Sequence, residues 1–351
     1  MTALLALLLA LVALAGDAGR PEVVDLSDFP RLEHETTDNG RIGRWLSAEP
    51  RSVHRWAGVL QVAAPGIREW RPRHLEGVCG SQGNAMYGTR LVPVGEWTEE
   101  QAVLTLTART VLRCLVIQAA VDDGESATDP GYGLVVRKGH GSQLEHVMVY
   151  GLRAGMDPDS LATGRRWRGA RRAGVYTDWL NGGTLNDIVV RQVEGVGVLL
   201  SQTNGVSADI NVSIGHSDGV LVWGSKPHPW SAYPGGESGS GLELHLRAEA
   251  LDGWALRCSG SERAMIRGGY VEQTEGGIWL HGCPWWSINM PRAGNRPLRL
   301  TGTSWGTRIE WLMGVGLWEY EDGRRVYSPI ELGYWLKGSA RRRVPRSWLI
   351  G

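Results

Sequence analysis

Gly174-Val-Tyr-Thr-Asp178, Gly197-Val-Leu-Leu-Ser201 and Gly219-Val-Leu-Val-Trp223 are copies of one strand-like pattern, and their recurrence decides the fold. Further copies begin at Gly133, Gly253 and Gly277. The steps between the six glycines are 41, 23, 22, 34 and 24 residues, so a unit of 22–24 residues recurs and two units carry insertions. A fixed period of this size, with strand character and no helical periodicity, is typical of a β-solenoid.

Side chains alternate between the two faces of each repeat. The residues one and three places after each glycine are apolar except Thr177, so we expect this set to fill the interior. The residues two places after it are mostly apolar but face outward, which is typical of a groove, a covering loop or a subunit contact. The residues four places after it form an outward column, which reads Arg137, Asp178, Ser201, Trp223, Arg257 and His281.

Composition narrows the class of protein. The chain has 351 residues and 49 glycines, and a β-solenoid of this length can form one domain. The formal net charge is zero, whereas proteins that bind nucleic acids or membrane surfaces are normally basic. We therefore predict neither a nucleic-acid nor a membrane partner.

The N-terminus predicts export. Residues 3–15 form an apolar run that ends in Ala13-Leu14-Ala15, an A-x-A-type cleavage site. The run is shorter than the roughly 20 residues that a transmembrane helix needs. We predict a signal peptide over residues 1–15 and a secreted protein. No Lys or Arg precedes the run, so a buried N-terminal helix and a misassigned start codon stay open as alternatives.

Four cysteines are present, Cys79, Cys114, Cys258 and Cys283. An even number in an exported chain permits disulfides, but the spacing does not fix the pairing. We favour small buried hydrophobic residues as their role. No Cys/His cluster predicts zinc, so we expect no metal and no cofactor, with calcium left open.

The remaining chain divides into three parts. Residues 16–57 form an N-terminal segment in which Ile42, Trp45 and Leu46 have the spacing of a short capping helix. Residues 58–300 form the β-helix, and residues 301–351 form a C-terminal cap and tail. Residues 318–327 predict an irregular hairpin with an acidic-Gly turn.

Several motifs resemble the pectate-lyase-like superfamily. They are Asp28-Phe29, Thr36-Thr37-Asp38-Asn39, the Pro-x-Gly ending of residues 58–66, and the glycine pattern of residues 75–89. The resemblance covers residues 25–300, although the usual Gly after Phe29 and a Gly-Asp-Gly before the Thr-Asp pair are absent. It implies an all-β, single-stranded right-handed parallel β-helix and, as a tendency of the family, a polysaccharide ligand.

The outward column is the first candidate site. Tyr176, Trp223 and Trp279 can stack on sugar rings, with Ser201 beside them, and Arg137 and Arg257 can bind carboxylates in two-pronged fashion. Asp178 can act as general acid or base, Arg257 can neutralise a uronate during elimination, and His281 can act as a base. An ordinary solvated face is the alternative.

The reaction stays open at this stage. Glycosidases generally need two carboxylates, and only Asp178 lies on the column. Glu243 on a neighbouring sheet is a candidate for the second, as are Asp218 and Asp252, although both precede a glycine and suit ordinary turns. Lyase, hydrolase and no catalysis all remain possible.

Two insertions are the second candidate site. We predict that they wall a groove for an acidic polymer, because loops on a rigid scaffold often carry function. For the arginine-rich insertion, which carries Arg165 and Arg166, salt bridges within the molecule are an equally favoured alternative. The candidate residues are Arg165, Arg166, Trp167, His228, Trp230 and Tyr233.

The sequence thus predicts a secreted β-helix that binds an acidic polysaccharide along an outward strand face and, as lyase or hydrolase, can cleave it. One alternative is a phage tailspike or similar receptor-binding protein that assembles as a homotrimer through apolar outer residues. Another is a structural or adhesive solenoid without catalysis.

Overall fold

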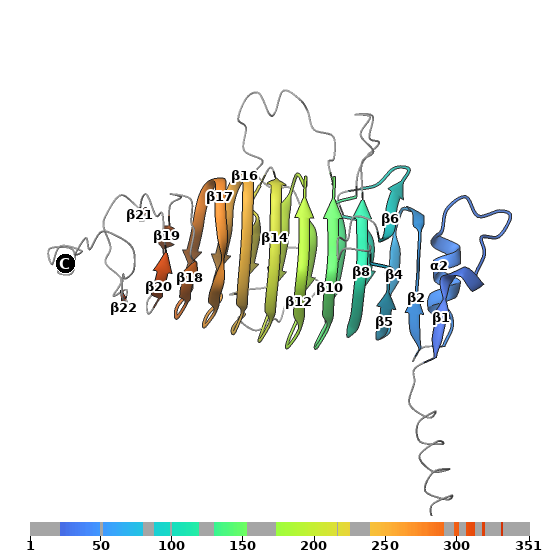
Figure 1. Ribbon diagram of the computed structural model, residues 1–351, viewed down its shortest axis with the longest axis horizontal. Helices are drawn as coiled ribbons and strands as arrows, with labels where there is room; N and C mark the ends of the chain where they lie inside the picture. Colours follow the sequence, from blue (N-terminus) through green and yellow to red (C-terminus); the bar gives the residue numbers. More distant parts are fainter. Residues whose placement is uncertain are drawn as a thin grey trace, which may run out of the picture.

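A computed structural model gives the architecture, and it describes residues 22–49, 52–79, 88–98, 100–118, 130–152, 173–215, 217–224, 239–290, 298–301, 307–312, 318–319 and 331–332. The described strands stack in parallel rungs along one axis, with the helix at the N-terminal end (Figure 1). This arrangement confirms the predicted parallel β-helix. No helix among the described residues is long and apolar enough to cross a membrane.

Two parallel ladders carry most of the rungs. The first ladder contains β1 (Val23–Asp25), β2 (Val53–Arg55), β5 (Arg73–Glu76), β8 (Thr110–Gln118), β10 (Gln143–Tyr150), β12 (Thr184–Arg191), β14 (Ser207–Gly215), β16 (Glu243–Ser259), β17 (Met265–His281), β18 (Ser287–Met290), β20 (Arg308–Leu312) and β22 (Glu331–Leu332). The second ladder shares β16 and β17 and adds β4 (Ile67–Glu69), β7 (Ala102–Leu106), β9 (Tyr132–Arg137), β11 (Ala173–Asp178), β13 (Val196–Ser201), β15 (Val220–Trp223), β19 (Leu298–Thr301) and β21 (Trp318–Glu319). The remaining strands, β3 (Val59–Ala63) and β6 (Thr89–Val94), pair with each other, and β6 also pairs with the end of β8.

A shared backbone bend turns the strands of the first ladder at one corner. Cys114, His146 and Asp187 occupy equivalent places in β8, β10 and β12, with left-handed φ values of 57°, 54° and 52°. Such values are uncommon for residues other than glycine. The bend therefore lets apolar side chains on both sides of the corner point into the interior.

Apart from Trp254 in the fifth repeat, the predicted interior residues of the second ladder are buried, as expected. Val175, Val198 and Val222 are fully buried in the main core, and Thr177 is fully buried as well. Each rung places its inward side chains over those of the rung before it, because the pairing is in register. Stacking of this kind buries a continuous apolar core that no single repeat can form alone.

The fifth repeat departs from the predicted register by two residues. Val220 pairs with Leu256, and Leu256 pairs with Ile278, so Ala255 takes the place expected for Gly253. Trp254, predicted to point inward, is only partly buried. A Cβ atom on Gly276 would lie 2.3 Å from its ring, so the indole covers that glycine in the next rung. A bulge between Leu251 and Trp254 absorbs the shift.

The N-terminal end is closed by the predicted helix, here α2 (Asn39–Ser47), which follows the short helix η1 (Leu26–Asp28). Its buried residues are Ile42, Trp45 and Leu46, as the spacing predicted. The Trp45 ring stacks on Trp56 of the first rungs at 5.3 Å. At the other end, β20, β21 and β22 continue the parallel pairing, and residues 320–327 of the predicted hairpin lie outside the described residues.

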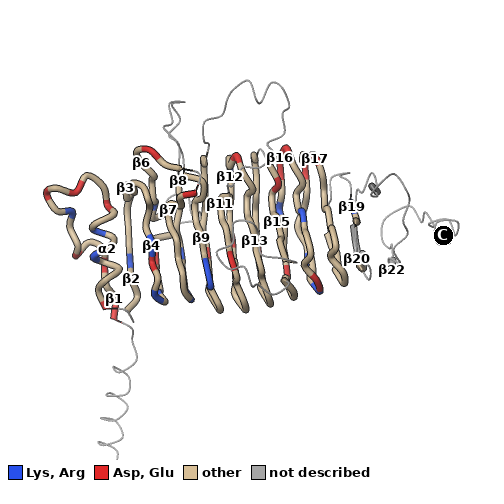
Figure 2. Tube along the Cα trace, turned by 180° about the vertical axis from the view of Figure 1, so that it is seen from behind, with Lys and Arg blue, Asp and Glu red and all other residues tan. Residues whose placement is uncertain are grey.

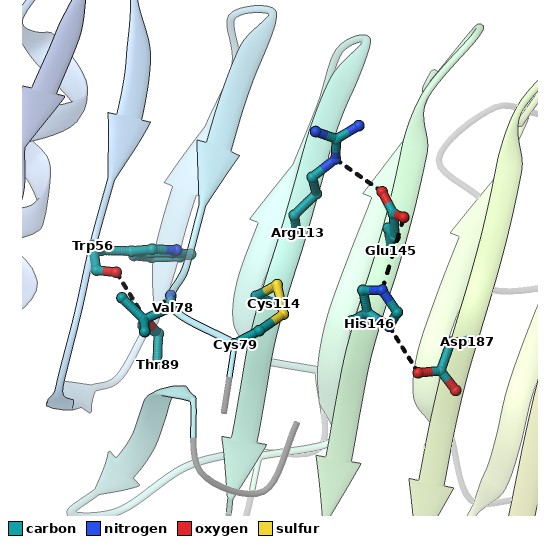
Figure 3. Close-up of a disulfide and its surroundings, with 9 residues drawn as sticks. All are labelled: Trp56, Val78, Cys79, Thr89, Arg113, Cys114, Glu145, His146 and Asp187. Carbon is teal, nitrogen blue, oxygen red and sulfur yellow. Dashed lines mark hydrogen bonds and ion pairs between the residues drawn. A yellow bond between two sulfur atoms is a disulfide. The ribbon is translucent and has the colours of Figure 1, made fainter. Parts of the chain in front are cut away.

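The cysteines divide into two pairs. Cys79, just beyond β5, forms a disulfide with Cys114 at the corner of β8 (Figure 3). The expectation that all four are buried hydrophobic thiols is therefore wrong for this pair. Cys258 and Cys283 are buried thiols.

Candidate functional site

The strand pairing defines the outward column of the second ladder. Arg137, Asp178, Ser201, Trp223 and His281 lie on it as predicted. Between Trp223 and His281 the column contains Ser259, and Thr301 follows His281. Arg257 was predicted on this column but lies on the neighbouring one, because of the two-residue shift in the fifth repeat. That neighbouring column reads Val135, Tyr176, Leu199, Leu221, Arg257, Trp279 and Arg299.

The part of this face on β11 and β13 is buried, whereas Arg137 on β9 is partly exposed. Tyr176, Asp178 and Ser201 are fully buried, which corrects the expectation of an exposed strip at these rungs. Tyr176 stacks on Tyr132 at 5.7 Å, and both belong to a small apolar cluster separate from the main core. The Ser201 hydroxyl group has no hydrogen-bond partner among the described residues. A water molecule or a ligand group can satisfy a buried hydroxyl of this kind.

Tyr176 is held in its protonated form. Burial raises the pKa of its phenol, and the nearby negative charge of Asp178 raises it further. The neutral phenol is therefore a hydrogen-bond donor beside a carboxylate on the same strand, β11.

The part of the face on β16, β17 and β19 is open and rich in arginine and tryptophan. The guanidinium groups of Arg257 and Arg299 each lie 4.5 Å from the ring centroid of Trp279. The rings of Trp254 and Trp279 are 5.5 Å apart. Arg257, Trp279 and Arg299 are successive partners in neighbouring strands, so the ladder itself produces this stack. We call Trp254, Arg257, Trp279 and Arg299 the arginine–tryptophan platform.

Hydrogen bonds fix the far edge of the platform. Trp279 donates from Nε1 to the Thr301 hydroxyl oxygen at 3.0 Å, and His281 Nδ1 lies 2.9 Å from the same oxygen. His281 is exposed and lies next to Trp279 on the adjacent column. It is thus an exposed titratable group beside this aromatic surface.

Asp218 lies at the near edge of the platform, just before β15. Its carboxylate accepts a hydrogen bond from the Trp254 amide at 2.9 Å, and Arg257 Nη1 lies 3.6 Å from its other oxygen. Burial raises the pKa of Asp218, although the Trp254 amide and the Arg257 charge oppose this rise. A carboxyl with a perturbed pKa beside exposed charged groups is typical of functional sites. The Asp-Gly step made it look like a turn residue, and only the pairing of β15 with β16 reveals its neighbours.

The structure brings some of the sequence-predicted residues together and separates others. Arg257, Trp279 and His281 lie together at the platform. Asp178 and His281 are four rung steps apart on one column, which is roughly 19 Å at about 4.8 Å per step, so they do not act on one bond. The six insertion residues Arg165, Arg166, Trp167, His228, Trp230 and Tyr233 lie outside the described residues.

A second surface, missed from the sequence apart from Glu243, lies on the first ladder. It is a groove of about 590 Å³ lined by polar side chains of β10, β12, β14, β16 and β17, including Glu145, Asn186 and Asp209. Alternation along each strand predicts which side chains face outward. The sequence alone did not give the register between the strands, so it did not show that these side chains are neighbours. The other lining residues are Gln143, Thr184, Leu185, Ser207, Ala208, Glu243, His245 and Arg267.

Ion pairs link the rungs around this groove. Arg113 Nε lies 2.9 Å from Glu145, and His146 Nδ1 lies 2.9 Å from Asp187, as Figure 3 shows. Asp209 contacts His245 at 3.1 Å in the same manner. Charges of both signs are spread along the rungs (Figure 2). In the described part of the chain, no group of three or more His, Cys, Asp or Glu side chains is placed to hold a metal ion.

Comparison with known proteins identifies the fold. No protein-family model and no curated protein matches the chain. Among solved structures, the A-module of the Azotobacter vinelandii mannuronan C-5 epimerase AlgE6 matches with a TM-score of 0.50 and 12% identity, over 84% of this chain and 82% of that one. The chain has a parallel β-helix fold like that of this module. At this identity, the likeness of the β-helix to the AlgE6 module shows the fold alone.

Two further solved structures are similar at lower scores. The Agl-KA catalytic domain matches with a TM-score of 0.46 and 14% identity, over 84% of this chain and 57% of that one. The Dettilon tailspike protein matches with a TM-score of 0.47 and 11% identity, over 82% of this chain and 61% of that one. The β-helix thus spans little more than half the length of the Agl-KA domain.

Proposed function

We propose that this β-helix binds an acidic polysaccharide at the arginine–tryptophan platform. The observation that carries the proposal is the stack in which two guanidinium groups flank Trp279, with Trp254 beside it. Guanidinium groups match carboxylates in geometry and charge, and the indole that they flank fixes their positions. The AlgE6 module, named as an epimerase of mannuronan, supports a polysaccharide as the ligand.

The charges of the platform favour an anionic ligand over a neutral one. The platform places two guanidinium groups on the Trp279 ring. The Asp218 carboxyl lies 3.6 Å from one of them, that of Arg257. A hydrogen bond to a charged group contributes about 1.5–3 kcal/mol. A cation over an aromatic ring contributes about 0.5–2 kcal/mol, so the stack also holds both arginines in place before the ligand arrives.

Replacing Trp279 tests the platform directly. We expect Trp279→Ala to weaken binding of an acidic polysaccharide by roughly tenfold or more, which corresponds to about 1.4 kcal/mol or more. Isothermal titration with a panel of acidic polysaccharides and their carboxyl-reduced forms measures this. Arg257→Ala should reduce binding of the acidic forms more than that of the reduced forms.

Trp70→Ala is the matched control, because Trp70 is 62% exposed and lies in the turn after β4, away from the platform. It should bind as the parent protein does. Equal affinity of folded Trp279→Ala and the parent for every acidic polysaccharide bound would refute the site.

Cleavage at the platform is a second candidate function. The observation that favours it is the position of Asp218, 3.6 Å from Arg257 at the edge of the platform, with a pKa that burial raises, because a raised pKa brings a carboxyl closer to the range suited to general acid–base catalysis. His281, two residues from Trp279 on β17, is the candidate base. New reducing ends would report cleavage, and unsaturated product ends would distinguish elimination from hydrolysis. Asp218→Asn should abolish either product while binding persists.

We also propose that the protein functions outside the cytosol. The Cys79–Cys114 disulfide supports this, because disulfides persist mainly in oxidising compartments. The apolar run of residues 3–15 supports it from the sequence. Expression in a secreting host, followed by N-terminal sequencing of the exported chain, tests both at once.

A further inference from the structure

The thiols of Cys258 and Cys283 lie unusually close together. Their sulfur atoms are 2.7 Å apart, and both residues are fully buried. Ordinary nonbonded contacts between carbon atoms are about 3.5–4.0 Å, and the larger sulfur atoms need no less, whereas a disulfide bond measures about 2.05 Å. The pair is therefore closer to bonding distance than to nonbonded contact.

The surroundings leave each thiol with the other as its reaction partner. In the described part of the chain, the other two cysteines are already joined to each other. Cys283 Sγ also lies 3.2 Å from the His281 carbonyl oxygen, which holds the side chain in the turn after β17. Burial raises the pKa of Cys258. For Cys283 burial acts in the same direction, but hydrogen bonding with Cys258 and with the nearby backbone outweighs it and lowers the pKa.

We propose that Cys258 and Cys283 form a second disulfide, which fixes the two strands that carry the platform. Cys258 follows Arg257 on β16, and Cys283 lies two residues after His281. The bond would tie the interior side of one platform strand to the turn that ends the next. This structural role rests on the proposed function, whereas the bond itself does not.

The reaction is thiol–disulfide exchange during folding. Cys283, as thiolate, attacks a small-molecule or protein disulfide of an oxidising compartment, and one thiol leaves. Cys258 then loses its proton, attacks the mixed disulfide and releases the second thiol. One S–S bond forms in the chain, the two cysteines lose two electrons and two protons, and the acceptor disulfide is reduced to two thiols. The exchange precedes complete folding, because both sulfur atoms are buried afterwards.

Intact mass spectrometry decides whether the bond exists. The full chain, purified without reductant from an oxidising compartment, is denatured in guanidinium chloride with iodoacetamide. We expect no alkylated cysteine and, after proteolysis, a linked peptide pair containing residues 258 and 283. Alkylation of Cys258 and Cys283, with the other disulfide intact, would overturn the proposal.

Variants test the same bond independently. In Cys258→Ser, Cys283 should become the one alkylated cysteine, and Cys79–Cys114 should stay linked. The double variant Cys258→Ala/Cys283→Ala should unfold several degrees below the parent when both are oxidised. After both proteins are fully reduced, that difference should shrink. An equal difference in both states would mean that lost packing, not a lost bond, causes it.

A binding measurement separates this inference from the proposed function. If the parent binds an acidic polysaccharide, lower affinity of the folded double variant supports the role in fixing the platform, and equal affinity refutes that role. If the parent binds none, the mass spectrum still decides the bond.

Discussion

The Asp218 carboxyl combines two roles that are seldom compatible. It accepts a hydrogen bond from the Trp254 amide at 2.9 Å and so helps to hold the bend of β16 in place. The same burial that makes this hydrogen bond effective disfavours its negative charge and raises its pKa. Burial therefore makes the ionised carboxylate unfavourable, and the Trp254 amide and the Arg257 charge offset part of this cost.

Asp218→Asn should raise the melting temperature at neutral pH. A carboxyl whose folded pKa is raised binds its proton more tightly in the folded state, so it favours folding at low pH and costs stability as pH rises. The gain in the variant should be near zero below the ordinary value of 3.8, grow as pH passes through the raised pKa, and then stay constant. Each unit of raised pKa corresponds to about 1.4 kcal/mol.

Thermal unfolding measured from acidic to neutral pH checks this. Asp252→Asn is the control, because Asp252 also precedes a glycine but is exposed. A gain that is the same at every pH, or largest in acid, would contradict the proposed cause.

At the scale of the strand, the glycines of β9, β11 and β13 (Gly133, Gly174 and Gly197) allow the rungs to approach closely. A Cβ atom at Gly197 would lie 2.5 Å from the Gly219 carbonyl oxygen and 2.5 Å from Val212 Cγ1. Gly174 and Gly133 face the same two kinds of neighbour in their own rungs. The recurring glycine is therefore a packing requirement, which is why it was visible in the sequence.

Gly197→Ala should destabilise the protein by about 1–3 kcal/mol, because the added methyl group overpacks a filled interior. The measurement is the unfolding midpoint in guanidinium chloride. Gly43→Ala is the control, since Gly43 is in α2 and its Cβ would meet nothing within 4 Å. There we expect a gain of about 0.5–1 kcal/mol from helix propensity. A loss at Gly43 equal to that at Gly197 would argue against close rung packing as the cause.

The same strands show how far the sequence could predict the fold and the site. Alternation and glycine spacing were sufficient for the parallel ladder and its interior, because each repeat contacts only its neighbours. They failed at β16, where Gly253 fits the pattern but Ala255 takes the glycine position. The Trp254 ring there lies on the outer surface and covers Gly276. That one shift moved Arg257 to the column of Trp279 and so created the platform.

Burial of the outer face could not be predicted either. Asp178 and Ser201 have polar side chains at outward positions, yet both are fully buried. Alternation tells which face a side chain points to, whereas exposure depends on contacts between segments far apart in the sequence. The sequence pointed to aromatic and charged residues of the platform as candidates, but it did not predict that they contact one another.

At the scale of the whole molecule, the solenoid has an open end that must be covered. Helix α2 covers the N-terminal end, opposite the C-terminal strands (Figure 1). Trp45 is its anchor: it is fully buried, stacks on Trp56, and donates from Nε1 to the Val24 carbonyl oxygen at 2.9 Å. The cap is thus attached both to the first rungs and to the chain that leads into them.

Trp45→Ala should cost about 3–5 kcal/mol and expose the first rungs. We expect a lower melting temperature and faster hydrogen exchange that begins at β2 and β3 and weakens along the axis, because rungs contact only their neighbours. Hydrogen exchange with mass spectrometry resolves this gradient. Leu32→Ala is the control, since Leu32 is 45% exposed near the same end. Uniform loss of protection in all rungs would contradict nearest-neighbour coupling.

The in-register pairing of rungs also makes the molecule a ruler. Each rung adds about 4.8 Å to the axis and one residue to every outward column. A gene that duplicates or loses one repeat would lengthen or shorten the ligand-binding face by a fixed increment, without rebuilding the remaining rungs. The length of polymer that such a face can hold is therefore inherited as a whole number of repeats.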